Sequence, residues 1–151
     1  MAYIEKTIIA GEHIFKEKSF SARYGKKNIP RGPNWNECSE VQRRRNELLK
    51  KKRIVWNICT NFKKSDWWVT LTYRRTERPD SMVMAKKQRS RFIRRLREKL
   101  KKKDIPLTYT AMTERGVKGG LHHHFIIKNV FEIGIIVNLW EYGKVDRKSV
   151  V

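Results

Sequence analysis

Three consecutive histidines, His122, His123 and His124, have the clearest potential for chemistry in this sequence. The composition of residues 121–127 predicts a strand, so His122 and His124 should project from one face of a sheet and His123 from the other. Two imidazoles side by side on a stiff strand can bind one divalent metal ion at little ordering cost. The pair is therefore a candidate metal site, with a polar sheet face as the plainer alternative.

A third ligand is predicted on the preceding strand. Residues 107–114 have strand composition, and the glycine-rich segment 115–120 predicts a turn that closes a hairpin. Glu114 should then lie close to His122, where its carboxylate would complete the ligand set and leave positions open for a substrate. The alternative is a solvated glutamate. Because imidazole favours zinc-like ions and carboxylate favours magnesium or manganese, the residues alone leave the metal open.

The elements that must position this hairpin follow from patterns elsewhere in the chain. Residues 40–61 predict a helix that begins with a capping box. Residues 67–73 are rich in β-branched and aromatic side chains and predict a buried strand. Residues 82–102 predict an amphipathic, very basic helix. The apolar segment 130–142 predicts a short helix or a connection to a further strand.

This order of elements predicts an α+β fold, a central antiparallel β-sheet with helices packed on it. Residues 38–151 are expected to form that core, and residues 1–37 an N-terminal arm with strand-like runs at 4–9 and 13–20. Trp67, Trp68 and Trp140 are expected to pack in the core. Trp56, which lies among basic residues, is equally compatible with packing and with base stacking.

The charge of the chain indicates a polyanionic partner. Lys and Arg number 36 against 15 acidic residues, a formal net charge of +21, and binding phosphates releases condensed counterions. An anionic membrane surface is the rival partner. The 11% aromatic content favours single-stranded nucleic acid, because bases stack on aromatic faces. The residues predicted to contact DNA are Lys86, Lys87, Arg91, Arg94, Arg95, Arg115 and Lys118.

The sequence also bears on where the protein acts. No stretch approaches the ~20 apolar residues of a membrane span, and the N-terminus lacks the order of a signal peptide. Cys38 and Cys59 are too few for a disulfide framework and are expected to be reduced thiols. A cytoplasmic location without membrane attachment is therefore expected.

Three segments taken together, residues 69–73, residues 92–96 and the stretch from Glu114 to Phe125, resemble the HUH superfamily of rolling-circle replication initiators. The likeness is closest to the phage and mobile-element group related to the filamentous-phage gene II protein, and it covers roughly residues 38–142. It implies a ferredoxin-like sheet (the HUH endonuclease fold) with the histidine strand near its centre. It also implies His122 and His124 as metal ligands and Mg²⁺ or Mn²⁺ as the ion.

The activity that this resemblance implies is nicking and rejoining of single-stranded DNA at the rolling-circle origin of a phage, plasmid or mobile element. A tyrosine cleaves the strand, leaving a 5′-phosphotyrosine link and a free 3′-hydroxyl. Host replication proteins are further expected partners. The alternative is a single-stranded nucleic-acid-binding module without catalysis, for which the histidines have no special role.

The family's nucleophile lies on a helix after the histidine strand, commonly as Tyr followed three residues later by Lys. Tyr142 is the only tyrosine after His124, and its segment looks like the family's Trp-x-x-Gly approach to the next strand. We expect a C-terminally incomplete core whose nucleophile lies beyond Val151. Two alternatives stay open: Tyr142 has taken over the role, or the chain only binds DNA. Tyr73 and Tyr109 are expected to be structural.

Overall fold

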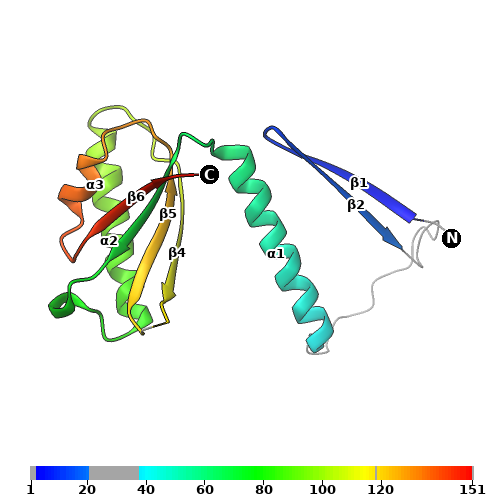
Figure 1. Cartoon of the computed structure of the whole chain (residues 1–151), viewed down its shortest axis with the longest axis horizontal. Helices are drawn as coiled ribbons and strands as arrows, with labels where there is room; N and C mark the ends of the chain where they lie inside the picture. Colours follow the sequence, from blue (N-terminus) through cyan, green and yellow to red (C-terminus); the bar gives the residue numbers. More distant parts are fainter. Residues whose placement is uncertain (1–2, 21–37, 118, 151) are drawn as a thin grey trace. The chain divides into compact units, whose positions relative to one another are not determined.

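The computed structural model of the chain describes residues 3–20, 38–117 and 119–150 (Figure 1). By its packing the chain divides into two compact units, Met1–Asn61 and Phe62–Val151. Each unit is described by itself. The functional boundary predicted between the arm and the core, after residue 37, stays a prediction.

The first unit contains a hairpin and a helix. Strands β1 (Tyr3–Ala10) and β2 (His13–Phe20) pair antiparallel, as the strand-like runs in the sequence suggested. Helix α1 (Glu40–Asn61) has the predicted bounds. Its start is the predicted cap, since the backbone N–H of Gln42 donates to the Ser39 hydroxyl at 3.2 Å.

Side chains join the hairpin of this unit to α1. Lys52 pairs with Glu17 at 2.5 Å, and the rings of Phe15 and Trp56 lie 6.4 Å apart. Lys6 lies over the Trp56 ring at 5.8 Å, a cation–π arrangement. Trp56 therefore packs within its own unit.

The second unit has the element order βαββαβ and carries the histidine run. Its strands and helices are β3 (Trp67–Thr72), α2 (Met82–Lys101), β4 (Tyr109–Arg115), β5 (Leu121–Ile127), α3 (Gly134–Leu139) and β6 (Val145–Ser149), with a single 3-10 turn at Arg75–Glu77. The sheet order is β4-β5-β3-β6, with every neighbouring pair antiparallel. The ferredoxin-like α+β fold is thus confirmed, with the histidine strand inside the sheet.

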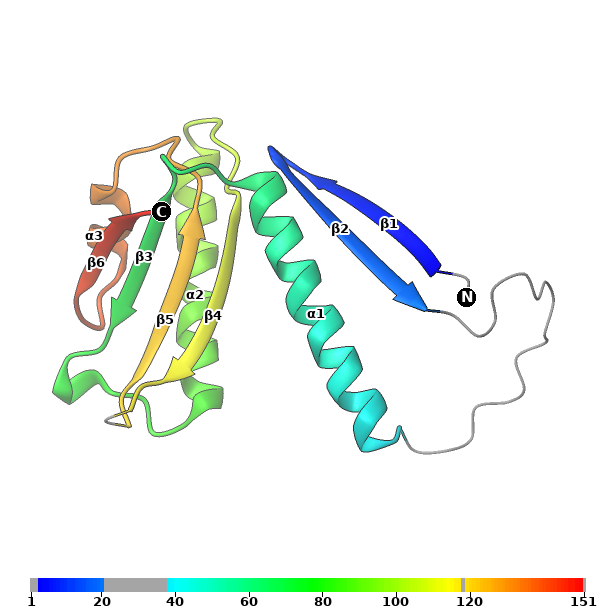
Figure 2. The ribbon, with the colours of Figure 1, turned by 45° about the vertical axis from the view of Figure 1, so that its right-hand side comes forward.

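The helices α2 and α3 lie on one face of this sheet, which we call the helical face (Figure 2). Val69 and Leu71 point to it and are fully buried, while the alternating Thr70 and Thr72 point the other way. We call the opposite side the outer face. Strand alternation and register assign to it Trp68, Thr70, Thr72, Thr110, Met112, Glu114, His122, His124, Ile126, Asp146 and Lys148.

The two adjacent tryptophans of β3 lie on different faces of the sheet. Trp67 and Trp140 are 5% and 3% exposed and belong to the core, as predicted. Trp68 is 36% exposed and lies on the outer face, so the expectation that it packs in the core is wrong. The reason is the two-residue period of a strand, which turns consecutive side chains to opposite faces.

Helix α2 covers the sheet with an apolar stripe. Phe92, Leu96 and Leu100 are buried against the sheet, and the ring of Phe92 lies 5.7 Å from that of Phe125. The Ser81 hydroxyl caps the helix by accepting from the backbone N–H of Met84 at 3.2 Å. The predicted amphipathic helix is therefore confirmed, and its basic residues are exposed apart from the half-buried Arg89 and Arg95. None of the helices in the described part of the chain combines the length and the apolar character that a membrane span requires.

Part-buried hydrogen bonds close the sheet at its two ends. The Asp66 carboxylate accepts backbone N–H groups from Lys63 and Asn129, at 2.8 and 2.9 Å, which ties the start of β3 to the end of β5. At the other end the Trp140 indole N–H donates to the Thr72 carbonyl at 2.9 Å. A side chain at Gly143 would lie 2.0 Å from that same carbonyl oxygen, so the chain can pass there only as glycine.

Candidate metal centre

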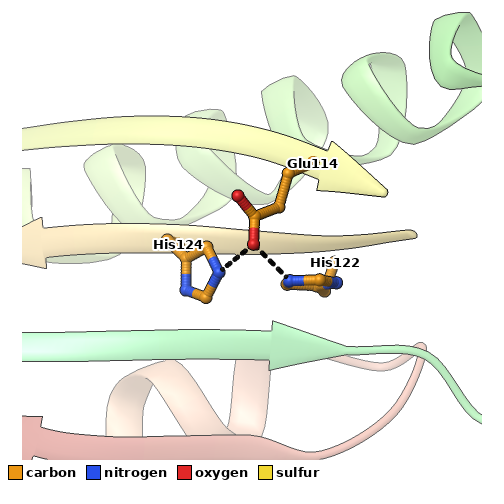
Figure 3. A group of neighbouring side chains, drawn as sticks. All are labelled: Glu114, His122 and His124. Carbon is orange, nitrogen blue, oxygen red and sulfur yellow. Dashed lines mark hydrogen bonds and ion pairs between the residues drawn. The ribbon is translucent and has the colours of Figure 1, made fainter. Parts of the chain in front are cut away.

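Glu114, His122 and His124 converge on the outer face (Figure 3). The hairpin register places Glu114 opposite His122, as the sequence predicted. The Glu114 Oε1 atom lies 2.8 Å from Nε2 of His122 and 2.9 Å from Nε2 of His124. One ligand atom from each residue lies within 4.8 Å of the others, so the three can share one divalent ion.

The second nitrogen of each ring also has a partner. The Nδ1 atom of His124 lies 3.2 Å from the Thr70 hydroxyl, and that of His122 lies 3.4 Å from the Gly120 carbonyl oxygen. A carbonyl only accepts, so it favours a proton on Nδ1 of His122, and with a metal bound the Nε2 atom would present its lone pair to the ion. A cation between that lone pair and the Glu114 carboxylate satisfies both groups. This arrangement fits a divalent metal.

The carboxylate is the charged partner of the site. Hydrogen bonds from His124 and then His122 lower the pKa of Glu114, so the residue is ionised at neutral pH. Its side chain is 44% exposed, while the imidazoles of His122 and His124 are 20% and 18% exposed. A ligand from solvent can therefore reach the group. Two imidazoles and one carboxylate leave further coordination positions for a water or phosphate oxygen.

His123 projects from the helical face, as predicted, and is fully buried. Its Nε2 atom lies 2.7 Å from the Tyr73 hydroxyl, and its Nδ1 atom lies 2.9 Å from the Thr113 hydroxyl. Arg89 donates to the same Thr113 oxygen at 2.8 Å. Burial lowers the pKa of His123 to about 4, so the ring is neutral and serves packing. Burial also raises the pKa of Tyr73, with the neighbouring Tyr142 as a second cause.

The structure does not bring Tyr142 to this group. Its ring packs on the helical face, 6.1 Å from the ring of Tyr73 and 5.1 Å from that of Trp140. Arg91 of α2 donates to its hydroxyl at 3.4 Å. The sheet therefore separates Tyr142 from the His122–His124 pair.

The predicted DNA-contacting residues fall in two places. Lys86, Lys87, Arg91 and Arg94 line a shallow hollow on the exposed side of α2. Arg95, on the same helix, pairs with Glu141 at 2.9 Å. Because α2 covers the helical face, this basic surface lies on the opposite side of the sheet from the metal centre.

The remaining two predicted contacts belong to the turn of the hairpin. Arg115 follows Glu114 directly and donates to the Gly119 carbonyl at 3.2 Å. Lys118 lies outside the described residues. Arg115 is thus the only described member of the predicted set that comes from the hairpin carrying the ligands.

Sequence reasoning missed two residues beside the ligands. The ring of Trp68 lies 5.5 Å from that of His124, and Thr70 contacts its Nδ1 atom. The signal was the alternation within β3, since Trp68 and Thr70 share a face. Alternation does not show which strand pairs with β3, so it could not place these two residues beside His124.

A comparison with family models gives the lineage of this unit. The model of the replication-associated protein family ORF2/gene II protein matches residues 66–150, more than half of the chain. The chain belongs to this family. Membership confirms the predicted relation to replication initiators and implies a role in DNA replication and binding to DNA. No curated protein and no solved structure matches the chain.

The part that matches this replication-associated family coincides with the βαββαβ unit. Its first and last residues are themselves joined, since the backbone N–H of Val150 donates to the Asp66 carbonyl at 3.0 Å. All three converging side chains lie inside this segment. The hairpin of β1 and β2 and helix α1 precede it.

Proposed function

We propose that the chain is a divalent-metal-dependent replication initiator that nicks and rejoins single-stranded DNA at the rolling-circle origin of a phage, plasmid or mobile element. The observation that carries this proposal is the convergence of Glu114, His122 and His124 within a unit of the replication-associated family. We further propose that it acts in the cytoplasm together with host replication proteins. Its free cysteines, Cys38 and Cys59, suit a reducing compartment.

The chemistry assigns each group a task. When bound, Mg²⁺ or Mn²⁺ would polarise an oxygen of the scissile phosphate. Glu114 supplies the negative charge that holds the ion, and the two imidazoles are oriented by Thr70 and Gly120. We also propose that Arg115, in the turn of the hairpin, contacts a DNA phosphate. In the nicking step a tyrosine hydroxyl gives up its proton as its oxygen bonds to phosphorus, the bond to the 3′ oxygen breaks, and that oxygen takes up a proton. Rejoining is the reverse.

Incubation with labelled single-stranded DNA and Mn²⁺ tests the proposal. If a tyrosine of this chain is the nucleophile, a covalent protein–DNA adduct should appear on a denaturing gel, and the double variant His122→Ala, His124→Ala should not form it. His123→Gln is the matched control, because that residue faces the other side of the same strand. Tyr142→Phe asks whether Tyr142 is the nucleophile, since loss of the adduct in this variant alone would assign it. An adduct that persists in EDTA would contradict the metal-dependent proposal.

One observation favours a second candidate, a DNA-binding protein without catalysis. The tyrosines of the second unit, Tyr73, Tyr109 and Tyr142, all lie on the helical face, where Tyr109 packs 6.2 Å from the ring of Phe125. This candidate predicts DNA binding, with or without metal dependence, and no adduct under any condition. The gel that tests the first proposal therefore separates the two.

We also propose that the exposed side of α2 contacts phosphates. Neutralising Lys86, Lys87 and Arg91 to Gln should weaken binding to all DNA sequences alike and flatten the dependence of log affinity on log salt, by roughly 0.7 to 0.9 for each lost phosphate contact. A control variant loses the same charge at scattered exposed positions, Lys64, Lys103 and Lys144. Equal effects of the two variants would show that only net charge matters.

A further inference from the structure

Trp68 is placed unlike the other tryptophans of its unit. It lies on the outer face and is 36% exposed, whereas Trp67 and Trp140 are buried. Its ring lies 5.5 Å from that of the ligand His124, at an interplanar angle of 45°. A large indole left partly open beside a metal centre offers a flat apolar surface to whatever binds there.

The residues around Trp68 suit a nucleotide. Register places Ile126 of β5 on one side of Trp68 and Lys148 of β6 on the other, in one row across the sheet. The next row holds Thr70 and His124. Two residues along a strand span about 7 Å, a distance that a single extended nucleotide can bridge. A phosphate at the metal centre would thus have a neighbouring base within reach of the indole, and a lysine beyond it.

We propose that Trp68 is a base-stacking subsite for single-stranded DNA. The base next to the phosphate held at the Glu114–His122–His124 group stacks on the exposed indole, and Lys148 pairs with the adjoining backbone. This inference rests on the proposed function, because it takes single-stranded DNA as the ligand of the outer face. The net charge of +21 and the family's role in replication favour a nucleic acid over an apolar protein surface as the occupant. Stacking tolerates any base, so this subsite positions the strand without reading its sequence.

Binding of a short fluorescent oligothymidylate to the full chain, followed by anisotropy, tests the subsite. Trp68→Thr keeps a good strand former next to Thr70 and should weaken binding by roughly 5- to 100-fold. Trp68→Phe, which retains an aromatic face, should bind within about threefold of the wild type. The matched control is Met112→Thr, another exposed apolar residue of the outer face, 51% exposed but without a ring. It should leave the affinity close to that of the wild type.

Two further measurements separate stacking from general damage. Bases within a duplex are already stacked on one another. Trp68→Thr and the wild type should therefore bind a duplex of the same length with equal affinity. In a series of oligonucleotides, the single abasic site is placed at a different position in each. At one position it should weaken binding to the wild type but not to Trp68→Thr. Mn²⁺ affinity measured by calorimetry should be the same for both proteins, because Trp68 supplies no ligand atom.

The outcomes distinguish this inference from the function on which it rests. Wild-type affinity of Trp68→Thr for the oligothymidylate, with Mn²⁺ and DNA binding intact, would overturn the subsite and leave the proposed function standing. An equal loss of duplex and single-strand binding would overturn stacking as well. Failure of the wild type to bind single-stranded DNA at all would overturn both proposals.

Discussion

The buried imidazole of His123 makes the stability of the second unit depend on pH. Its pKa is lowered to about 4 in the folded protein, against an ordinary value of about 6.5 in an unfolded chain. Between these values the unfolded chain binds a proton that the folded protein does not, so protons favour unfolding. The contribution of His123 to the free energy of unfolding is constant above about pH 6.5, and it is lost as the pH falls toward 4.

The size of this effect follows from the two pKa values. On going from pH 7.5 to pH 5, the titration of this one residue should reduce the free energy of unfolding by about 2 kcal/mol. The variant His123→Gln removes the titration, while its amide can still hydrogen-bond with Tyr73 and Thr113, the partners of the imidazole. The variant should therefore lose about 2 kcal/mol less than the wild type over this pH range.

Urea unfolding at the two pH values, in EDTA, measures the difference. His13→Gln is the control, because His13 is exposed on β2 in the other unit, and this variant should lose as much as the wild type. If His123→Gln and the wild type lost the same stability between pH 7.5 and pH 5, the assignment of a buried neutral imidazole would be refuted.

Three other changes have defined outcomes. The double variant His122→Ala, His124→Ala should reduce Mn²⁺ affinity below detection by calorimetry, and retained affinity would refute the metal centre. Asp66→Ala removes a buried carboxylate that accepts two part-buried backbone N–H groups and should lower the free energy of unfolding by about 1–3 kcal/mol, while Asp80→Ala at an exposed turn should change it little. Gly143→Ala forces a carbon against a carbonyl oxygen of β3 and should cost about 3 kcal/mol in urea unfolding; wild-type stability would contradict the tight crossing.

The hairpin that carries the candidate ligands was predictable because its determinants are local. The strand 121–127, the glycine-rich turn and Glu114 lie within one short stretch of chain. Strand alternation alone predicted that His123 projects from the opposite face of the sheet to His122 and His124. The bounds of α1 followed equally from its cap and its apolar spacing.

Placement across the sheet was beyond the sequence. Which face of the sheet α2 covers is set by packing between distant segments, and neither segment encodes it alone. For this reason the sequence could not show that the basic residues of α2, predicted to contact DNA, and Tyr142, the alternative nucleophile, lie across the sheet from His122 and His124. Trp68 was wrongly predicted to be in the core, because a run of β-branched and aromatic residues does not show which of its two alternating sets of side chains is buried.

All three converging side chains come from β4 and β5, whereas Trp68 belongs to β3 and Lys148 to β6. Under the proposals above, the residues that bind the metal and the residues that hold the DNA therefore lie on different β-strands. Mutations of Trp68 or Lys148 would then alter how tightly a single strand is held, without moving a donor atom of the hairpin. A lineage could tune its affinity for single strands by this route while the proposed metal ligands stayed unchanged.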